Sequence, residues 1–330
     1  MDKVVIESLL EKIPALKAEI CKQIVGQEAV VDQLLITFIA GGHALLEGVP
    51  GLAKTLMIRT LAEALDSSFK RIQFTPDLMP SDIIGTEVLQ ADPMTGSRQF
   101  QFQKGPIFSN IILADEINRT PPKTQAALLE AMQEYRVTYA GRSYPLPRPF
   151  FILATQNPIE QAGTFPLPEA QMDRFLLYIT IDYPGEAEEQ NILESTTGTA
   201  EPDIQKVLTG EEILELQKLV REVHINKALI GYVNSLVRAT RPQTSSIDYV
   251  KEWVQWGAGP RAGQAMILTA KAQALLEGRF AVIPEDLEAV VYPVFRHRII
   301  VNFRAEAEGI SADQVTKELM EKIKPPKAKL

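Results

Sequence analysis

The first apolar pattern in the chain is a repeat at intervals of three and four residues, which places apolar side chains on one face of a helix. It predicts an amphipathic helix near the N-terminus. Its members are Ile6, Leu9, Leu10, Ile13, Leu16 and Ile20. A second helix is predicted over residues 27–40, because Gly41 and Gly42 suit the left-handed turn after a helix end. A short apolar strand over residues 43–47 follows.

From residue 54 onward, stretches with helical spacing alternate with short apolar stretches that are typical of strands. Strands that alternate with helices pair in parallel, so the pattern predicts an α/β fold in which helices sandwich a parallel sheet. Two of the strands are apolar throughout, as expected for a sheet that is covered on both faces. The predicted helices cover residues 54–65 and 121–133, and the predicted strands cover residues 69–74, 111–114, 150–155 and 176–181.

The strand pattern ends near Tyr183, Pro184 and Gly185, and helical spacing interrupted by turns continues toward the C-terminus. We therefore predict an α/β domain over residues 1–190 and an all-helical domain over residues 191–330. A length of 330 residues is sufficient for two domains.

Charge and composition narrow the classes of function. The formal net charge of −8 argues against a broad basic surface for nucleic acid, because phosphate neutralisation needs clustered Lys and Arg. Cys21 is the only cysteine, which excludes an internal disulfide and fits a reducing cytosol. The N-terminus lacks the pattern of an export signal, and no apolar stretch approaches the ~20 residues of a membrane span. We expect a soluble, cytoplasmic protein.

Residues 48–55, with the sequence GVPGLAKT, follow the short strand and open the next helix, which is the context of a phosphate-binding loop. Backbone N–H groups of such a loop cradle phosphate oxygens, Lys54 neutralises the β and γ phosphates of ATP, and the Thr55 hydroxyl binds Mg²⁺. Ala53 replaces the usual third glycine and is tolerated if its φ is negative. The alternative is a glycine-rich turn with an exposed lysine. The expected ATP-binding residues here are Gly48, Val49, Pro50, Gly51, Leu52, Ala53, Lys54, Thr55 and Leu56.

Two acidic residues, Asp115 and Glu116, follow the apolar strand over residues 111–114. We expect Asp115 to hold Mg²⁺ through water and Glu116 to act as the general base that activates the attacking water. A cap on the helix that follows is the alternative role for these acids. Asn157 ends the next strand and is placed to orient the lytic water if that strand lies between the other two. Its alternative role is that of a turn residue before Pro158.

Together with Asp173, Arg174 and Phe175, these motifs resemble the AAA+ ATPases, and the match is close to the MoxR family. The shared stretches span most of the chain, and an alanine at position 53 is itself common in this family. The stretches are IVGQE (24–28), GVPGLAKT (48–55), DEINR (115–119), PKTQAALLEAMQE (122–134), ATQNP (154–158), LPEAQMDRF (167–175) and GPRA (259–262).

The resemblance implies roles for several further residues. Asn157 matches sensor 1, and Arg261 matches sensor 2, which contacts the γ phosphate from the helical domain. Arg174 matches the arginine finger, which a subunit supplies to the ATP of its neighbour, because a guanidinium stays charged and spreads its donors over phosphate oxygens. Arg119 is the alternative candidate for that role. The residues that match the adenine pocket are Ile24, Val25 and Gly26.

Two insertions of the family also have counterparts. Residues 85–104 resemble the insert within helix 2, and residues 135–147 resemble the hairpin before sensor 1. The three histidines, His43, His224 and His297, lack the spacing of metal ligands, and we assign no catalytic role to them.

The leading hypothesis is an ATPase that binds ATP and Mg²⁺ and works as a ring, expected to be a hexamer. The resemblance implies that hydrolysis drives chaperone-like remodelling, activation or cofactor insertion in partner proteins, typically proteins with von Willebrand factor A domains. The alternative is a nucleic-acid-associated AAA+ motor, whose affinity for nucleic acid would fall steeply with salt. The acidic balance of the chain argues against that alternative. A small-molecule kinase with the same loop fits poorly with an arginine finger.

Overall fold

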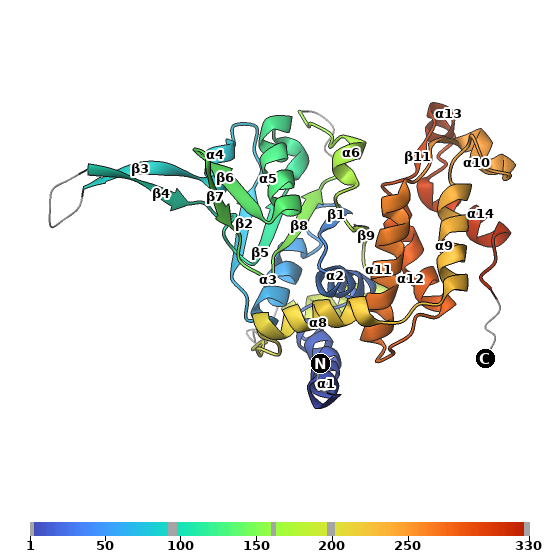
Figure 1. Cartoon of the computed structure of the whole chain (residues 1–330), viewed down its shortest axis with the longest axis horizontal. Coiled ribbons are helices and arrows are strands. Elements are labelled where there is room, and N and C mark those ends of the chain that lie inside the picture. The colour runs from blue at the N-terminus through green and yellow to red at the C-terminus, as the bar shows by residue number, and fades with distance from the viewer. Residues whose placement is uncertain (1–2, 92–97, 160–162, 197–201, 327–330) are drawn as a thin grey trace.

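A five-stranded parallel sheet forms the centre of the computed structural model, which describes residues 3–91, 98–159, 163–196 and 202–326 (Figure 1). The strands lie in the order β2-β5-β8-β1-β9, and every neighbouring pair runs parallel. Their bounds are β1 Ala44–Gly48, β2 Phe69–Gln73, β5 Ile111–Asp115, β8 Phe151–Gln156 and β9 Leu177–Ile181.

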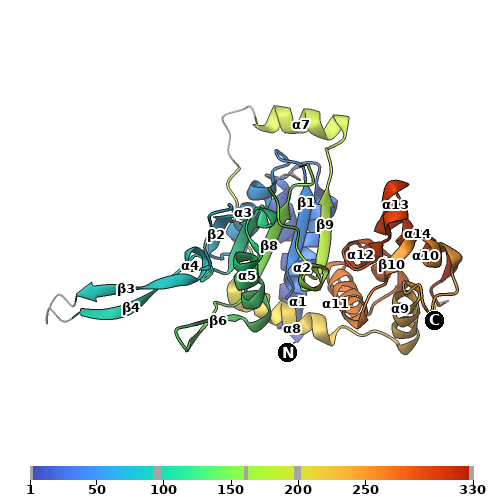
Figure 2. The ribbon, with the colours of Figure 1, turned by 90° about the horizontal axis from the view of Figure 1, so that it is seen from above.

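Helices cover both faces of this sheet, because its central strands are apolar on both sides (Figure 2). On one face, Leu46 of β1 belongs to the same apolar cluster as residues of α1, α2 and α3. On the other face, Leu45 belongs to a second cluster with residues of α4 and α5. The predicted α/β sandwich is therefore confirmed. The helices are α1 Lys3–Cys21, α2 Glu28–Ile39, α3 Lys54–Ala64, α4 Pro80–Ile84 and α5 Pro122–Glu134.

Two antiparallel hairpins extend from the core in the stretches expected to be insertions. The longer one projects away from the sheet (Figure 1), and its middle, residues 92–97, lies outside the described residues. The ring of Phe102 in the longer hairpin stacks on the ring of Tyr144 in the shorter one, with 4.4 Å between centroids. The two hairpins are therefore in contact. They are β3 Gly85–Ala91 with β4 Arg98–Lys104, and β6 Arg136–Tyr139 with β7 Arg142–Pro145.

The C-terminal part consists mainly of helices that pack onto the core. One apolar cluster runs from α1, α2 and α3 into α8, α9, α11 and α12. A short antiparallel pair, β10 (Val254–Trp256) with β11 (Ile300–Val301), corrects the prediction of an all-helical domain. Strands of two or three residues are too short to give a period-two signal in the sequence. The helices are α7 Glu186–Thr196, α8 Gly210–Glu222, α9 Lys227–Ala239, α10 Asp248–Trp253, α11 Pro260–Leu276, α12 Pro284–Phe295, α13 Phe303–Ala307 and α14 Ala312–Lys322.

The short helices α4 and α6 (Glu169–Met172) were not predicted, whereas the helices and strands predicted between residues 27 and 181 agree with the structure to within one residue at each end. Their periodic apolar patterns are strong because both faces of the sheet are buried. Across the described ranges, no helix combines the length and the apolar character that crossing a membrane requires.

Candidate nucleotide site

The strand order brings three segments with candidate chemistry to one edge of the sheet. β8 lies between β5 and β1, which was the condition for placing Asn157 between the other two segments. The register pairs Thr155 of β8 with Leu46 of β1, just before the glycine-rich loop. It also pairs Ala154 with Ala114 of β5, just before the acidic pair. Because carboxyl ends of parallel strands form ligand sites, this edge is the candidate site.

The loop between β1 and α3 has the tight geometry of a phosphate cradle. A Cβ atom on Gly48 would lie 2.1 Å from Ile181 Cγ2 of β9, so only glycine fits there. Gly51 has a φ of +90°, which favours glycine. The Lys54 ammonium donates to the Gly48 carbonyl oxygen at 2.6 Å and thereby folds across the loop. The loop is thus closed by its own lysine.

Ala53 departs from the sequence expectation. Its φ is +53° and its ψ is 22°, a left-handed conformation, so the condition set for an alanine here, a negative φ, is not met. Ala53 is the last residue before α3, so the chain must turn there from the loop into the helix axis. The left-handed conformation costs an alanine about 1 kcal/mol, which the surrounding loop must offset.

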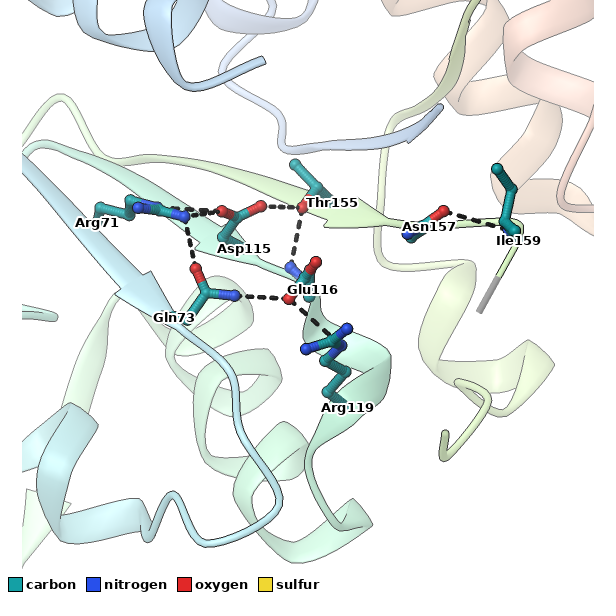
Figure 3. A network of polar contacts seen from close by, with 8 residues as sticks. All are labelled: Arg71, Gln73, Asp115, Glu116, Arg119, Thr155, Asn157 and Ile159. Carbon is teal, nitrogen blue, oxygen red and sulfur yellow. Dashed lines mark hydrogen bonds and ion pairs between the residues drawn. The ribbon is translucent and has the colours of Figure 1, made fainter. Parts of the chain in front are cut away.

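Asp115 is held on both carboxylate oxygens by groups of the same chain (Figure 3). Oδ2 accepts hydrogen bonds from Arg71 Nε at 3.0 Å and Nη2 at 2.6 Å. Oδ1 accepts from the Thr155 hydroxyl at 2.6 Å. The Thr155 hydroxyl oxygen in turn accepts from the Glu116 backbone N–H at 2.9 Å. Thr155 therefore fixes the side chain of one acid and the backbone of the next.

Glu116 is fixed through one of its two carboxylate oxygens. Its Oε2 accepts a hydrogen bond from Gln73 Nε2 at 2.6 Å and forms an ion pair with Arg119 Nε at 3.3 Å. Gln73 Oε1 accepts from Arg71 Nη2 at 2.6 Å, so the contacts to the two acids are linked (Figure 3). Glu116 has a φ of +58°, which turns its side chain out of the line of β5. Sequence reasoning missed Arg71, Gln73 and Thr155.

The remaining predicted residues at this edge lie at its periphery. Asn157 lies apart from the acidic network, and its Oδ1 accepts from the Ile159 backbone N–H at 3.2 Å (Figure 3). This contact is the turn interaction that was the alternative for Asn157. Ile24 is buried in the cluster of α1 to α3, and Val25 and Gly26 follow it before α2.

The segment that matches the adenine pocket is tied to the helix that opens at the phosphate loop. The hydroxyl of Thr60 on α3 donates to Gln23 Oε1 at 2.5 Å, one residue before Ile24. Gly26 has a φ of +74°, and a Cβ atom there would lie 2.7 Å from Glu188 Cβ of α7. The segment therefore sits between α3 and α7, and its backbone passes close to both.

Arg174 and Arg261 form a second group at the joint between the core and the C-terminal part. Both arginines line one cavity of about 270 Å³, and none of the described residues that line it belongs to the phosphate loop. Arg261 Nη1 lies 3.7 Å from Asp173 Oδ2. Arg174 follows α6 and is half-buried; its backbone N–H donates to the Gln171 carbonyl oxygen at 3.2 Å, whereas its guanidinium makes no hydrogen bond or ion pair within the described ranges. A second cavity of about 380 Å³ also contains Arg174.

The donors at the sheet edge fit a magnesium ion. Thr55 offers a hydroxyl and Asp115 a carboxylate, and oxygen ligands are those that Mg²⁺ prefers. Where the chain is described, no cluster of three or more His, Cys, Asp or Glu residues is arranged as a complete metal site. Such a sparse set suits Mg²⁺, which usually keeps several waters and binds phosphate oxygens. The Arg71 guanidinium at 2.6 Å from Asp115 shows that this carboxylate attracts a cation.

Comparison with known proteins agrees with this geometry. Residues 43–177 match the model of the ATPase family associated with various cellular activities (AAA), and residues 248–319 match the AAA lid domain. The chain is 44% identical to "Chaperone MoxR1" of Mycobacterium tuberculosis, over 93% of this chain and 81% of that protein. This chain belongs to the MoxR family of AAA+ ATPases.

Other relatives of this MoxR-family chain cover it almost completely. It is 42% identical to YeaC of Bacillus subtilis, over 92% of this chain and 91% of that protein. It is 32% identical to protein MoxR of Paracoccus denitrificans, over 84% and 86% of the two chains. A crystal structure of a protein from Cytophaga hutchinsonii has a TM-score of 0.91 at 43% identity and covers 98% of each chain. The fold is therefore an α/β AAA+ core with a helical lid.

Proposed function

We propose that this MoxR-type chain hydrolyses ATP, and that an oligomeric ring of its copies uses hydrolysis to remodel partner proteins. The single observation that carries the proposal is the split of the site. The loop, Asp115 and Glu116 form one group at the sheet edge, whereas Arg174 lies in a separate cavity without an anionic partner among the described residues. A half-buried guanidinium without a partner is suited to a phosphate that another subunit brings.

Each residue at the sheet edge has a distinct task in this proposal. The loop amides and Lys54 bind the phosphates. Arg261 belongs to the group at the core–lid joint, and in this proposal it contacts the γ phosphate from the lid. Thr55 and Asp115 hold Mg²⁺, which neutralises charge that develops on the phosphates. Asn157 orients the attacking water through its amide nitrogen, because its Oδ1 accepts from the Ile159 backbone N–H.

Glu116 is the base that takes a proton from the attacking water. The described contacts of its carboxylate engage Oε2, so Oε1 is the oxygen that remains to accept this proton. A carboxylate that is already held in place needs little rearrangement when the water arrives. Gln73 and Arg119 supply that support.

Arg174 is a better candidate for the finger than Arg119. The Arg119 guanidinium lies 3.3 Å from Glu116 of its own chain, where it supports the base. Arg174 instead reaches two cavities and has no competing carboxylate among its described contacts. The geometry therefore favours Arg174 for a role in the neighbour's site.

The biological role in this proposal comes from the relatives. One of them is named a chaperone, and remodelling of partner proteins is the corresponding activity. A hexameric ring, partners with von Willebrand factor A domains, cofactor insertion and a cytoplasmic location are the finer parts of the same proposal.

Glu116→Gln tests the assignment of the base. The variant should bind ATP with unchanged affinity but release phosphate about 10²- to 10⁴-fold more slowly, because the amide cannot take the proton. Fluorescent-nucleotide titration and a phosphate-release assay measure the two effects. Glu63→Gln, on the exposed face of α3, is the matched control and should behave like wild type. Undiminished phosphate release by Glu116→Gln would refute the assignment.

A further inference from the structure

Three consecutive side chains in the turn directly after α12 bind one short segment of the core. Arg298 Nε donates to Asp173 Oδ1 at 2.7 Å, and its Nη2 and Nη1 donate to the carbonyl oxygens of residues 175 and 176 at 2.8 and 3.1 Å. His297 Nε2 lies 3.1 Å from the Phe175 carbonyl oxygen. Arg296 Nη1 donates to the Tyr178 carbonyl oxygen at 2.8 Å. We call Arg296, His297 and Arg298 the α12 clasp.

His297 and Arg298 of the clasp are buried, whereas the side chain of Arg296 is 19% exposed. The side chain of Arg298 is only 4% exposed, and its charge faces Asp173, whose side chain is 31% exposed. A buried arginine must have most of its donors satisfied, and Arg298 also donates to the Val294 carbonyl oxygen at 2.7 Å. Burial lowers the pKa of His297 well below its usual value, so its ring is neutral and donates one N–H. The lid and this segment are therefore joined without intervening solvent.

The segment that the clasp holds carries Arg174 at its centre. Arg298 binds the residues on both sides of it, the carboxylate of Asp173 and the carbonyl of Phe175. The Phe175 side chain is fully buried in the core. The Arg174 guanidinium itself takes no part in these contacts, and it shares the cavity of about 270 Å³ with Arg298. The backbone of Arg174 is thus fixed to the lid, while its side chain remains available.

Asp173 also links this segment to a second arginine of the lid. Its Oδ2 lies 3.7 Å from Arg261, at the start of α11, and the side chain of Arg261 is 57% exposed. α11 and α12 pack against each other through the apolar cluster. Any change in the orientation of the lid therefore acts on Asp173 through Arg261 of α11 and through Arg298 after α12. Through Asp173 it also acts on the neighbouring Arg174.

We propose that Arg298 is a positioning residue for Arg174: it makes this arginine follow the lid, so that the orientation of one subunit's lid sets hydrolysis in its neighbour. This inference rests on the proposed role of Arg174 in the neighbouring subunit. It differs from that role because Arg298 touches neither nucleotide nor reacting atoms. In this way, a change in the orientation of one lid alters the rate of hydrolysis at the adjacent subunit's site.

Arg298→Ala and Arg298→Lys test the positioning role. A displacement of about 1 Å at a catalytic group costs up to about 10²-fold in rate, so Arg298→Ala should lower turnover in the assembled state by about 10- to 100-fold. Arg298→Lys keeps the charge opposite Asp173 but loses the fork to the carbonyls, and it should lie between alanine and wild type. Nucleotide affinity should stay within about twofold of wild type for both variants, since the phosphate loop is unchanged.

Arg279→Ala is the matched control. Arg279 pairs with the buried Asp286 at 2.6 Å, at the opposite end of the same helix α12, and both partners lie within the lid. Removing Arg279 breaks an ion pair of the same kind without touching the segment over residues 173–178. Its turnover per folded subunit should equal that of wild type.

Mixed assemblies distinguish positioning of Arg174 from a general defect. In a mixture with Glu116→Gln, the Arg298→Ala subunit has an intact base and receives a correctly placed Arg174 from its neighbour, so activity should return. In a mixture with Arg174→Ala, no subunit supplies a correctly placed Arg174, so activity should stay low. Recovery with Arg174→Ala, or recovery with neither variant, would overturn the inference.

A reference mixture separates this inference from the proposed function. Glu116→Gln with Arg174→Ala should regain activity if Arg174 acts in the neighbouring site. If this mixture stays inactive, the proposed role of Arg174 fails, and the role of Arg298 fails with it. If this mixture is active while Arg298→Ala has wild-type turnover, only the role of Arg298 fails.

Discussion

The two groups of charged residues in this protein differ in how far one chain satisfies them. At the sheet edge, Asp115 and Glu116 are met by Arg71, Thr155 and Gln73 of the same chain. At the core–lid joint, Arg174 has no anionic partner among the described residues. This difference separates the residues that a subunit uses at its own site from the arginine that we propose it supplies to its neighbour. In the proposed function, that subunit holds the phosphates and supplies the base, and it offers an arginine to another site.

The two groups also differ in what holds them. Both acids stand at the end of β5, whose register with its parallel neighbours β2 and β8 is fixed by backbone hydrogen bonds. Arg174 stands on a short segment after α6, where side chains of the turn that follows α12 supply the support. A strand end is held by its neighbours in the sheet, whereas the segment around Arg174 is held by the lid and, in our proposal, follows it. The sheet edge is therefore suited to catalysis, and the core–lid joint is suited to passing a change in lid orientation to a neighbouring subunit.

Arg174→Ala should have the largest effect on this comparison. Loss of an arginine finger costs about 10³- to 10⁵-fold in kcat, so turnover in the assembled state should collapse while ATP binding persists. Phosphate release across a range of protein concentrations measures the effect. Arg136→Ala is the control, because Arg136 lines the same cavity of about 380 Å³ but pairs with Glu134 at 3.2 Å. Normal turnover of Arg174→Ala would make Arg119 the better candidate.

Thr155→Val should have a smaller effect, confined to the sheet edge. Valine keeps the shape of this fully buried residue but removes the hydroxyl that fixes Asp115 and the Glu116 backbone. Loss of such a supporting hydrogen bond typically costs about 10- to 100-fold in metal affinity or activity. The Mg²⁺ dependence of nucleotide binding measures it without turnover.

The control for Thr155→Val is Thr37→Val. Thr37 is equally buried, but among the described residues its hydroxyl bonds only to the Gln33 carbonyl oxygen within α2. This variant should leave the Mg²⁺ dependence unchanged. An unchanged Mg²⁺ dependence in Thr155→Val itself would mean that Asp115 is positioned without the hydroxyl.

Lowering the pH should weaken the core–lid joint. We expect this effect to be smaller than those of Arg174→Ala and Thr155→Val. The pKa of His297 is well below 6.5 in the folded protein, so below about pH 6.5 the unfolded state binds a proton first. The free energy of unfolding should therefore fall, by about 1.4 kcal/mol per pH unit for this group. His43, whose pKa burial lowers to about 4, adds a similar loss down to that pH.

His297→Gln isolates the contribution of the joint. Urea unfolding at several pH values between about 7.5 and 5 should show a lower free energy of unfolding at neutral pH and a shallower decline with acid than in wild type. The slope that remains should reflect His43. A variant that declines as steeply as wild type would show that protonation of His297 does not weaken the joint.

The sequence predicted what depends on local patterns. The strands and helices of the core were found because their apolar periods are strong, and the loop around Lys54 and the acids after β5 were found because their spacing is local. These patterns also predicted a parallel sheet. They carry no information about which strands lie next to each other.

The rest depends on contacts between distant parts of the chain. Gln73 supports Glu116 because the register of β2 with β5 pairs Gln73 with Asp115, and Arg71 lies on the same face two residues earlier. The bonds from Arg298 to the segment over residues 173–176 span more than 120 positions. Polar residues near the end of a predicted strand are the only local signal that pointed to Arg71 and Gln73. His297, to which we assigned no role, shows no local signal at all.

The central claim, that one chain's Arg174 completes the site of another, is tested most directly by mixing two inactive variants. Glu116→Gln lacks the base and Arg174→Ala lacks the finger, so each assembly alone should release almost no phosphate. When they are mixed, interfaces that join an intact Glu116 to an intact Arg174 form, and phosphate release should rise above the sum of the two separate assemblies. Phosphate release equal to that sum at every mixing ratio, with mixed assembly verified, would contradict the account.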